Sequence, residues 1–267
     1  MCGIGRRVTA ALLALGLLAS GAWGARSETE VDVALVLAVD VSLSMETDEQ
    51  ELQRQGFVEA FRSPDVHEAI RKGALGRIAV VYVEWAGASY QEVIVPWTII
   101  AKPEDAMKFS SDLAQRSISR IGYTSISGAI DFGVSQLQKS GVQATREVID
   151  VSGDGPNNQG RNVTRARDDA VALGITINGL PIMLKRPDGF WDIDNLDHYY
   201  RDCVIAGSGA FMIPVRDKSQ FTEAIRGKII REIAVEPALG NLAQQARAEP
   251  PADCLAGENR SGRRMRN

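Results

Sequence analysis

The sequence is poor in the side chains and motifs that many enzymes use for hydrolysis. Its 267 residues include only two histidines, His67 and His198, and three cysteines. No Gly-x-Ser-x-Gly, His-Glu-x-x-His or Cys-x-x-Cys motif occurs. The glycine-rich segment at residues 153–160 lacks the lysine of a phosphate-binding P-loop. These absences argue against the common hydrolase classes and against nucleotide binding.

A long membrane-spanning run is also missing. An apolar run at residues 8–18 follows Arg6 and Arg7, but it is too short to cross a membrane comfortably. It precedes the small-residue site Ala22-Trp23-Gly24. This order predicts a secretory signal peptide over residues 1–24, with an uncleaved anchor as the alternative. We therefore expect a periplasmic or secreted chain with no transmembrane segment after cleavage.

Neither basic charge nor a cysteine framework characterises the remaining chain. Removing the signal peptide takes away two arginines and no acidic residue, so the formal charge of −4 becomes about −6. An acidic chain of this kind is not expected to bind nucleic acid. Cys203 and Cys254 remain after cleavage. In an oxidising compartment they form one disulfide or stay as two free thiols.

An apolar segment after the signal peptide ends in a polar cluster. Residues 33–39 are all apolar and lead into Asp40, a pattern typical of a central strand of a parallel sheet. Asp40, Ser42 and Ser44 then alternate with apolar residues, which in extended chain turns the three side chains to one side. Such a donor set suits Mg²⁺ or another hard divalent ion. The serines could equally cap the following helix, and the triplet alone leaves both roles open.

The order of apolar and helical segments predicts the fold. Strands are expected at residues 33–40, 78–85, 90–97, 147–152, 175–182 and 211–215, and helices at 46–61, 103–116, 125–139, 161–173 and 220–233. The short turn at residues 87–89 makes the strand at 90–97 antiparallel, and Pro96 suits a sheet edge. We therefore predict a doubly wound α/β domain with a mostly parallel sheet, one antiparallel edge strand and helices on both faces.

The domain is expected to cover residues 31–234. From residue 235 to 267 the composition shifts to Ala, Gln, Arg and Pro, which predicts a weakly ordered tail. Within the domain, Asp150 interrupts an otherwise apolar strand. Because buried charges need partners, we expect it to pair with a nearby arginine such as Arg146.

Two further polar positions are predicted to meet the Asp-x-Ser-x-Ser triplet. Thr124 stands at the entry of a predicted helix, and Asp154 follows the strand at residues 147–152. In a parallel sheet with right-handed crossovers, these points converge on one edge. Convergence of three separate segments favours a metal site over a helix cap.

This pattern resembles the von Willebrand factor A domain and its metal-ion-dependent adhesion site (MIDAS). That family has Asp-x-Ser-x-Ser, then a Thr that opens a later helix, then an Asp after a central strand. The matching segments are DVSLS at residues 40–44, GYTSISG at 122–128 and VIDVSGDG at 148–155. Residues 151–158 and 202–205 also resemble a bacterial secreted subgroup of unknown function.

The resemblance implies a role for each residue of the site. Ser42, Ser44 and Thr124 would give hydroxyl oxygens to the ion, and Asp40 and Asp154 would act mostly through bound water, or directly depending on the state of the site. Mg²⁺ is the expected ion, with Mn²⁺ and Ca²⁺ as alternatives. Two carboxylates leave a dication electrophilic, so an open coordination position attracts a carboxylate of a protein or peptide partner.

Three functions follow from these observations. The first is metal-dependent binding of a protein or peptide in adhesion or assembly outside the cytoplasm, without catalysis. The second is a metal-dependent hydrolase for a phosphoryl or carboxylate substrate, against which the lack of a general base counts. The third is a scaffold whose site holds no ion.

Overall fold

One five-stranded sheet forms the centre of the molecule. The computed structural model describes residues 28–185, 193–234 and 250–264. The strands lie in the order β3-β2-β1-β4-β5. Their bounds are β1 (Thr29–Asp40), β2 (Ile78–Trp85), β3 (Gln91–Ile100), β4 (Val142–Gly153) and β5 (Thr176–Pro181). All pairings are parallel except that of β3 with β2, so the predicted sheet with one antiparallel edge strand is confirmed.

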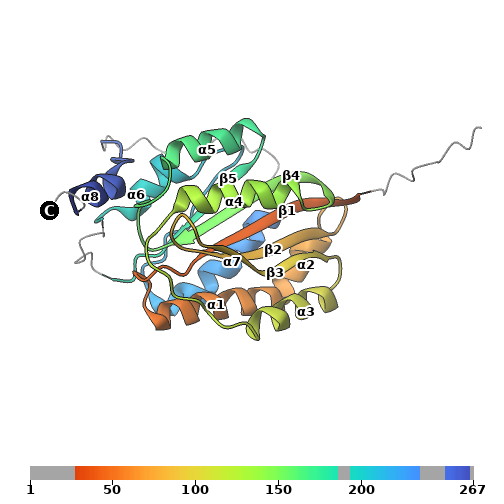
Figure 1. Ribbon diagram of the computed structural model, residues 1–267. Helices are drawn as coiled ribbons and strands as arrows, with labels where there is room; N and C mark the ends of the chain where they lie inside the picture. The colour runs from red at the N-terminus through yellow and green to blue at the C-terminus, as the bar shows by residue number, and fades with distance from the viewer. Residues whose placement is uncertain (1–27, 186–192, 235–249, 265–267) are drawn as a thin grey trace, which may run out of the picture.

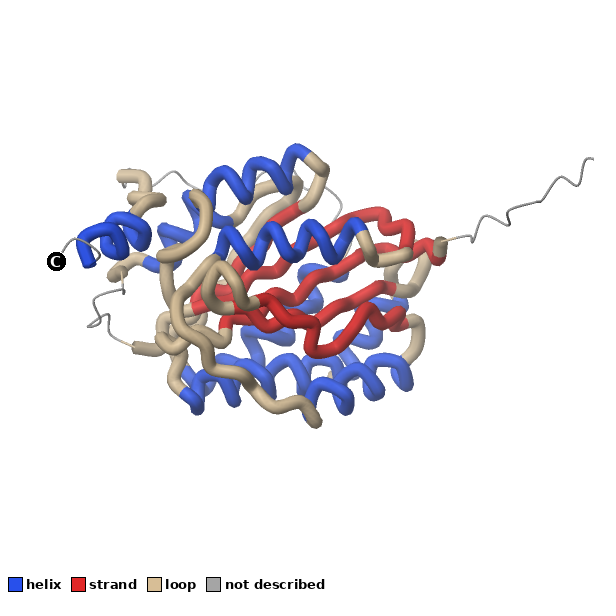
Figure 2. The backbone as a smooth tube through the Cα atoms, in the orientation of Figure 1, coloured by secondary structure: helices blue, strands red, loops and turns tan. Residues whose placement is uncertain are grey.

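Helices cover both faces of this sheet, as Figures 1 and 2 show. The first face carries α1, α2, α3 and α7, and the second carries α4, α5 and α6. The helix bounds are α1 (Thr47–Arg62), α2 (Pro64–Arg71), α3 (Pro103–Ala114), α4 (Ile126–Gln138), α5 (Val163–Ala172), α6 (Leu196–Tyr199) and α7 (Phe221–Ile233). A last helix, α8 (Ala256–Arg264), follows near the end of the chain.

Strand β1 is buried on both faces because its apolar side chains alternate between the two layers. Leu35 and Leu37 belong to the core under α1, α3 and α7, and Ala34 and Val36 belong to the core under α4 and α5. All four are 0% exposed. Burial on both sides explains the unbroken apolar run in the sequence. It also holds the carboxyl end of β1 firmly between the two helical layers.

The strand predicted at residues 211–215 does not form a regular ladder. Met212 and Val215 make only isolated parallel bridges, to Gly179 and Ile182. Ile213 N donates to Gly179 O at 3.1 Å and Val215 N to Pro181 O at 2.9 Å, so the nitrogen of Pro214, which carries no hydrogen, faces away from β5.

The predicted ion pair between Asp150 and Arg146 is wrong. Asp150 Oδ1 lies 2.7 Å from the ammonium of Lys228 on α7. Arg146 instead donates to the backbone carbonyl of Glu232, at 2.9 Å. Four residues along a strand span about 13 Å, which is too far for a direct contact. Asp150 therefore had to find its partner on a packed helix.

The tail has more structure than its composition predicted, within the part that the structure describes. Residues 250–264 include α8, and Cys254 forms a disulfide with Cys203. Ala252 N donates to Asp202 Oδ2 at 2.9 Å, and Glu258 Oε1 accepts from Asn157 Nδ2 at 2.8 Å. A covalent link and hydrogen bonds thus hold a segment that has few apolar residues.

Two other predictions concern the membrane and the chain ends. The predicted signal peptide at residues 1–24, together with residues 235–249 and 265–267 of the tail, lies outside the described residues. Among the helices that are described, none is both long and apolar enough to cross a bilayer.

Candidate metal centre

Asp40 is the last residue of β1 and is fully buried there. Its Oδ1 accepts a hydrogen bond from Ser42 N at 2.7 Å. Its Oδ2 meets no hydrogen-bond donor among the described residues. Burial raises the pKa of Asp40 well above the ordinary value, and the nearby Asp154 carboxylate raises this pKa further. A buried carboxylate with one unpaired oxygen is a feature that a bound cation would stabilise.

Gly153, which precedes Asp154, allows the Asp40 carboxylate to occupy its place. A Cβ on Gly153 would lie 2.7 Å from Asp40 Oδ2, which is closer than real Cβ contacts. The register places Val39 opposite Ser152, so the ends of β1 and β4 lie side by side. Only glycine at position 153 leaves room for the Asp40 side chain between the two strand ends.

The two serines connect Asp40 to Asp154 through a chain of hydrogen bonds. Ser42 Oγ lies 2.8 Å from Ser44 Oγ, and Ser44 Oγ donates to Asp154 Oδ1 at 2.6 Å. Ser42 makes an isolated bridge with Ile121, and the chain then turns, with Met45 N donating to Ser42 O at 3.1 Å. This turn, rather than the extended chain assumed from the spacing, brings the two hydroxyls together. Two carboxylates and two hydroxyls therefore converge at one point of the sheet edge.

Thr124 lies in the loop beside this group. The loop residue Ile121 donates from its backbone N to Val41 O at 3.2 Å. Thr124 N donates to Asn158 Oδ1 at 2.9 Å, and Asn158 N donates back to Thr124 O at 2.9 Å. The Thr124 hydroxyl lies 3.9 Å from the position of a Cβ on Gly155, the neighbour of Asp154. Hydrogen bonds between the two loops thus bring Thr124 to the Asp154 side of the group.

Lys185 and Glu49 also belong to the site, and the sequence reasoning missed both. Lys185 Nζ lies 3.3 Å from Asp154 Oδ2 and 3.3 Å from Glu49 Oε2. The same ammonium donates to the carbonyl oxygen of Ser44. Glu49 lies in the first turn of α1, directly after the serine cluster, and this position was the one available signal. Lys185 comes from the irregular chain after β5, where no pattern marks it.

The donor set is that of a hard divalent ion. Among the described residues, no group of three or more His, Cys, Asp or Glu side chains could hold a metal. The candidate site contains two carboxylates, of Asp40 and Asp154, and its other oxygens are hydroxyls. Oxygen donors of this kind suit Mg²⁺, Mn²⁺ or Ca²⁺ better than a soft ion. The unpaired buried oxygen of Asp40 is consistent with such an ion.

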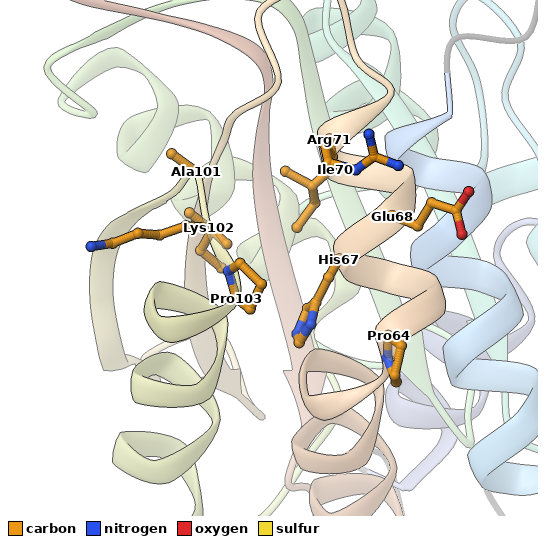
Figure 3. A pocket seen from close by; sticks show the side chains of 9 residues that line it. Pro64, His67, Glu68, Ile70, Arg71, Ala101, Lys102 and Pro103 are labelled. Atoms are coloured by element: carbon orange, nitrogen blue, oxygen red, sulfur yellow. The ribbon is translucent and has the colours of Figure 1, made fainter.

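His67 lies at the opposite edge of the sheet. A pocket of about 460 Å³ lies between α2 and the start of α3, and Figure 3 shows the His67 ring in it. Ile100, which also lines it, pairs with Ile78 at the amino end of β2, whereas Asp40 pairs with Trp85 at its carboxyl end. His67 Nε2 lies 2.7 Å from the Phe61 carbonyl oxygen, which gives this histidine a structural contact.

Comparison with protein families assigns the chain. Residues 30–237 match the family described as "Protein of unknown function (DUF1194)". The chain belongs to this family. No curated protein matches the sequence. The family assignment covers all five strands except Thr29, and all the residues of the candidate site.

Solved structures show the fold of this DUF1194 chain. The pilus adhesin SpaC from Lactobacillus rhamnosus GG, in an open conformation, has a TM-score of 0.56 at 12% identity, covering 78% of this chain and 31% of that one. A von Willebrand factor type A protein from Catenulispora acidiphila has a TM-score of 0.52 at 15% identity, covering 76% and 43%. Proximal thread matrix protein 1 from the mussel byssus, with a zinc-occupied MIDAS motif, has 0.54 at 11% identity, covering 76% and 46%.

These similarities show a von Willebrand factor A-like fold, as the resemblance in the sequence implied. The chain spans less than half the length of each of the three structures. Because identities are 11–15%, the similarity concerns the fold alone.

Proposed function

We propose that this domain binds a protein or peptide partner through a divalent cation, with Mg²⁺ as the expected ion and Mn²⁺ or Ca²⁺ as alternatives. Ser42, Ser44 and Thr124 would supply hydroxyl oxygens, and Asp40 and Asp154 would supply the negative charge. The observation that carries the proposal is the buried Oδ2 of Asp40, which meets no hydrogen-bond donor among the described residues. The other oxygen of this carboxylate accepts from Ser42 N, and the Ser42 and Ser44 hydroxyls lead from there to Asp154. The zinc-occupied MIDAS of the byssus protein supports the same placement of a metal in this fold.

Exposed apolar side chains around the site favour a protein partner over a small anion. Leu43 and Tyr123 are 55% and 53% exposed, and Ile121 is 36% exposed. Leu43 lies between the two serines, and Tyr123 precedes Thr124 in a left-handed backbone conformation, with φ of 67°. Large apolar side chains beside a cation suit a surface that contacts another chain. The cation would then bind a carboxylate of that partner.

The partner and the protein are proposed to meet outside the cytoplasm, in the periplasm or beyond the cell. The predicted signal peptide and the Cys203–Cys254 disulfide both fit an oxidising compartment. A role in adhesion or assembly agrees with the pilus adhesin among the similar structures.

We propose no catalytic step for this site. Asp154 and Glu49 both lie beside the Lys185 ammonium, and Asp40, the third carboxylate of the site, is fully buried at the end of β1. A general base needs to be available to a water or substrate proton. Paired or buried in this way, none of the three carboxylates is placed for that task.

Metal titration tests the proposal directly. Isothermal titration with MgCl₂ and MnCl₂ is expected to show one site in the wild type and at least 100-fold weaker binding in Asp40→Asn, because the variant removes a buried negative charge. Asp131→Asn is the matched control, since Asp131 is an exposed aspartate on α4 that pairs with Arg161. Equal affinity in Asp40→Asn and the wild type would refute the metal site.

A further inference from the structure

Lys185 is placed where its charge competes with a metal ion. Its ammonium contacts Asp154, a proposed ligand, and donates to the backbone carbonyl of Ser44, a second proposed ligand. The side chain is 32% exposed, so it can move without unpacking the core. A cation bound by the same two groups would lie close to the Lys185 ammonium, and the two positive charges would repel each other. The repulsion is strong because water is partly excluded from this site. The Lys185 ammonium and a bound dication therefore compete for the carboxylate of Asp154.

Glu49 is a second carboxylate with which the Lys185 ammonium can form an ion pair. Its side chain is 1% exposed, and Oε2 accepts from Glu46 N at 2.9 Å while lying 3.3 Å from Lys185 Nζ. The other oxygen, Oε1, meets no donor among the described residues. Burial raises the pKa of Glu49, and the Lys185 ammonium opposes this rise. A lysine that left Asp154 would thus gain by moving closer to Glu49.

We propose that Lys185 is an internal competitor for the metal, which releases Asp154 and moves onto Glu49 when the divalent ion binds. This inference rests on the proposed metal site. It assigns Lys185 the role of setting the metal affinity, and Glu49 the role of receiving the displaced ammonium. The affinity of the site for cations, and with it the affinity for a partner, is then lower than the oxygen donors alone would allow.

A purely structural ion pair predicts a different result. If Lys185 only anchors the chain after β5 to α1, its removal loosens Asp154 and weakens metal binding. If it competes, its removal strengthens metal binding. The sign of the change in affinity therefore separates the two roles.

The test is Mn²⁺ titration, by calorimetry, of the wild type, Lys185→Met, Lys185→Arg and Glu49→Gln. Lys185→Met is expected to bind Mn²⁺ at least ten-fold more tightly, and Lys185→Arg, which keeps the charge, to stay within about three-fold of the wild type. Lys108→Met is the matched control, because Lys108 is an exposed lysine on α3 paired with Asp112. Glu49→Gln is expected to weaken Mn²⁺ binding, and to do so more strongly when Lys185 is present than in the double variant with Lys185→Met.

The outcomes are distinct. Unchanged or weaker binding by Lys185→Met, with a cooperative unfolding transition that shows the variant is folded, overturns the competition while the metal site stands. No binding by any of these proteins overturns the metal site and this inference together. Lys185→Gln decides by the same criterion if Lys185→Met does not fold.

Discussion

Two lysine–carboxylate clusters in this molecule differ in how far their lysine is exposed to solvent, and this difference indicates their roles. In the core, Lys228 pairs with Asp150 at 2.7 Å and with Glu232, and all three side chains are 0–1% exposed. At the sheet edge, Lys185 contacts Asp154 and Glu49 but is 32% exposed. The core cluster is closed, whereas the edge cluster adjoins hydroxyl groups and an exposed apolar rim. The fully buried cluster is suited to stabilising the fold, and the partly exposed cluster is suited to binding an ion or a partner.

Their surroundings reinforce the contrast. Glu232 Oε2 accepts from Asn178 Nδ2 at 2.5 Å, and Asn178 Oδ1 accepts from Phe211 N at 2.8 Å. Lys228 also lies 4.8 Å from the centre of the Phe211 ring. This network attaches α7 to β4 and β5, and in it Lys228 lies beside the buried carboxylate of Asp150, whose Oδ2 meets no hydrogen-bond donor among the described residues. At the edge, Asp40 Oδ2 is likewise buried without a donor among the described residues, but the charge that acts on Asp40 is the Asp154 carboxylate rather than an ammonium.

The largest expected effect is on stability, in the core cluster. Lys228→Met leaves two buried carboxylates without their cation and is expected to lower the free energy of unfolding by about 3–5 kcal/mol. Urea unfolding followed by circular dichroism measures the change, with Lys108→Met as the control. A loss below about 1 kcal/mol would show that the core cluster is not a closed structural element.

The matching change at the edge is expected to cost less. Lys185→Met should lower the free energy of unfolding by about 1–2 kcal/mol in chelator, because water already reaches its ammonium while Glu49 stays buried. The same urea experiment measures it. A loss as large as that of Lys228→Met would remove the distinction between the two clusters.

A smaller effect is expected on the pH dependence of the free energy of unfolding, and it distinguishes Asp40 from an exposed aspartate such as Asp131. The pKa of Asp40 is raised in the folded state, so folding takes up a proton between the ordinary and the raised value. In chelator, stability is therefore present at low pH and falls as the pH rises through this window. Asp40→Asn should remove that part of the slope, and Asp131→Asn should keep it. Urea unfolding from pH 4 to 8 gives the comparison, and parallel curves for the wild type and Asp40→Asn would contradict it.

Local patterns in the sequence predicted the parts of the molecule that depend on alternation and on apolar runs. The mostly parallel sheet with one antiparallel edge strand follows from the alternation of strand and helix segments and from the short loop at residues 87–89. The Asp40, Ser42 and Ser44 side chains do meet, but a turn after Ser42 brings them together rather than an extended strand. The positions of Thr124 and Asp154 followed from topology, since strand ends meet at one edge of a parallel sheet.

Contacts between segments far apart in the chain were not predictable in this way. The partner of Asp150 is on α7, 78 positions away along the chain, and Lys185 reaches Asp154 from a loop without any periodic pattern. Helix α8 has a composition typical of disorder, and its hydrogen bond to Asn157 and the nearby disulfide hold it in place. Such pairings depend on packing geometry, which one-dimensional patterns do not contain.

The most direct test of the metal site is a crystal of the protein soaked in MnCl₂, with diffraction recorded for anomalous scattering. The account predicts one strong anomalous peak beside Asp40 Oδ2 and the hydroxyls of Ser42 and Ser44, on the side toward Thr124 and Asp154. A map without a peak there, or with Mn²⁺ bound only elsewhere on the surface, would contradict it.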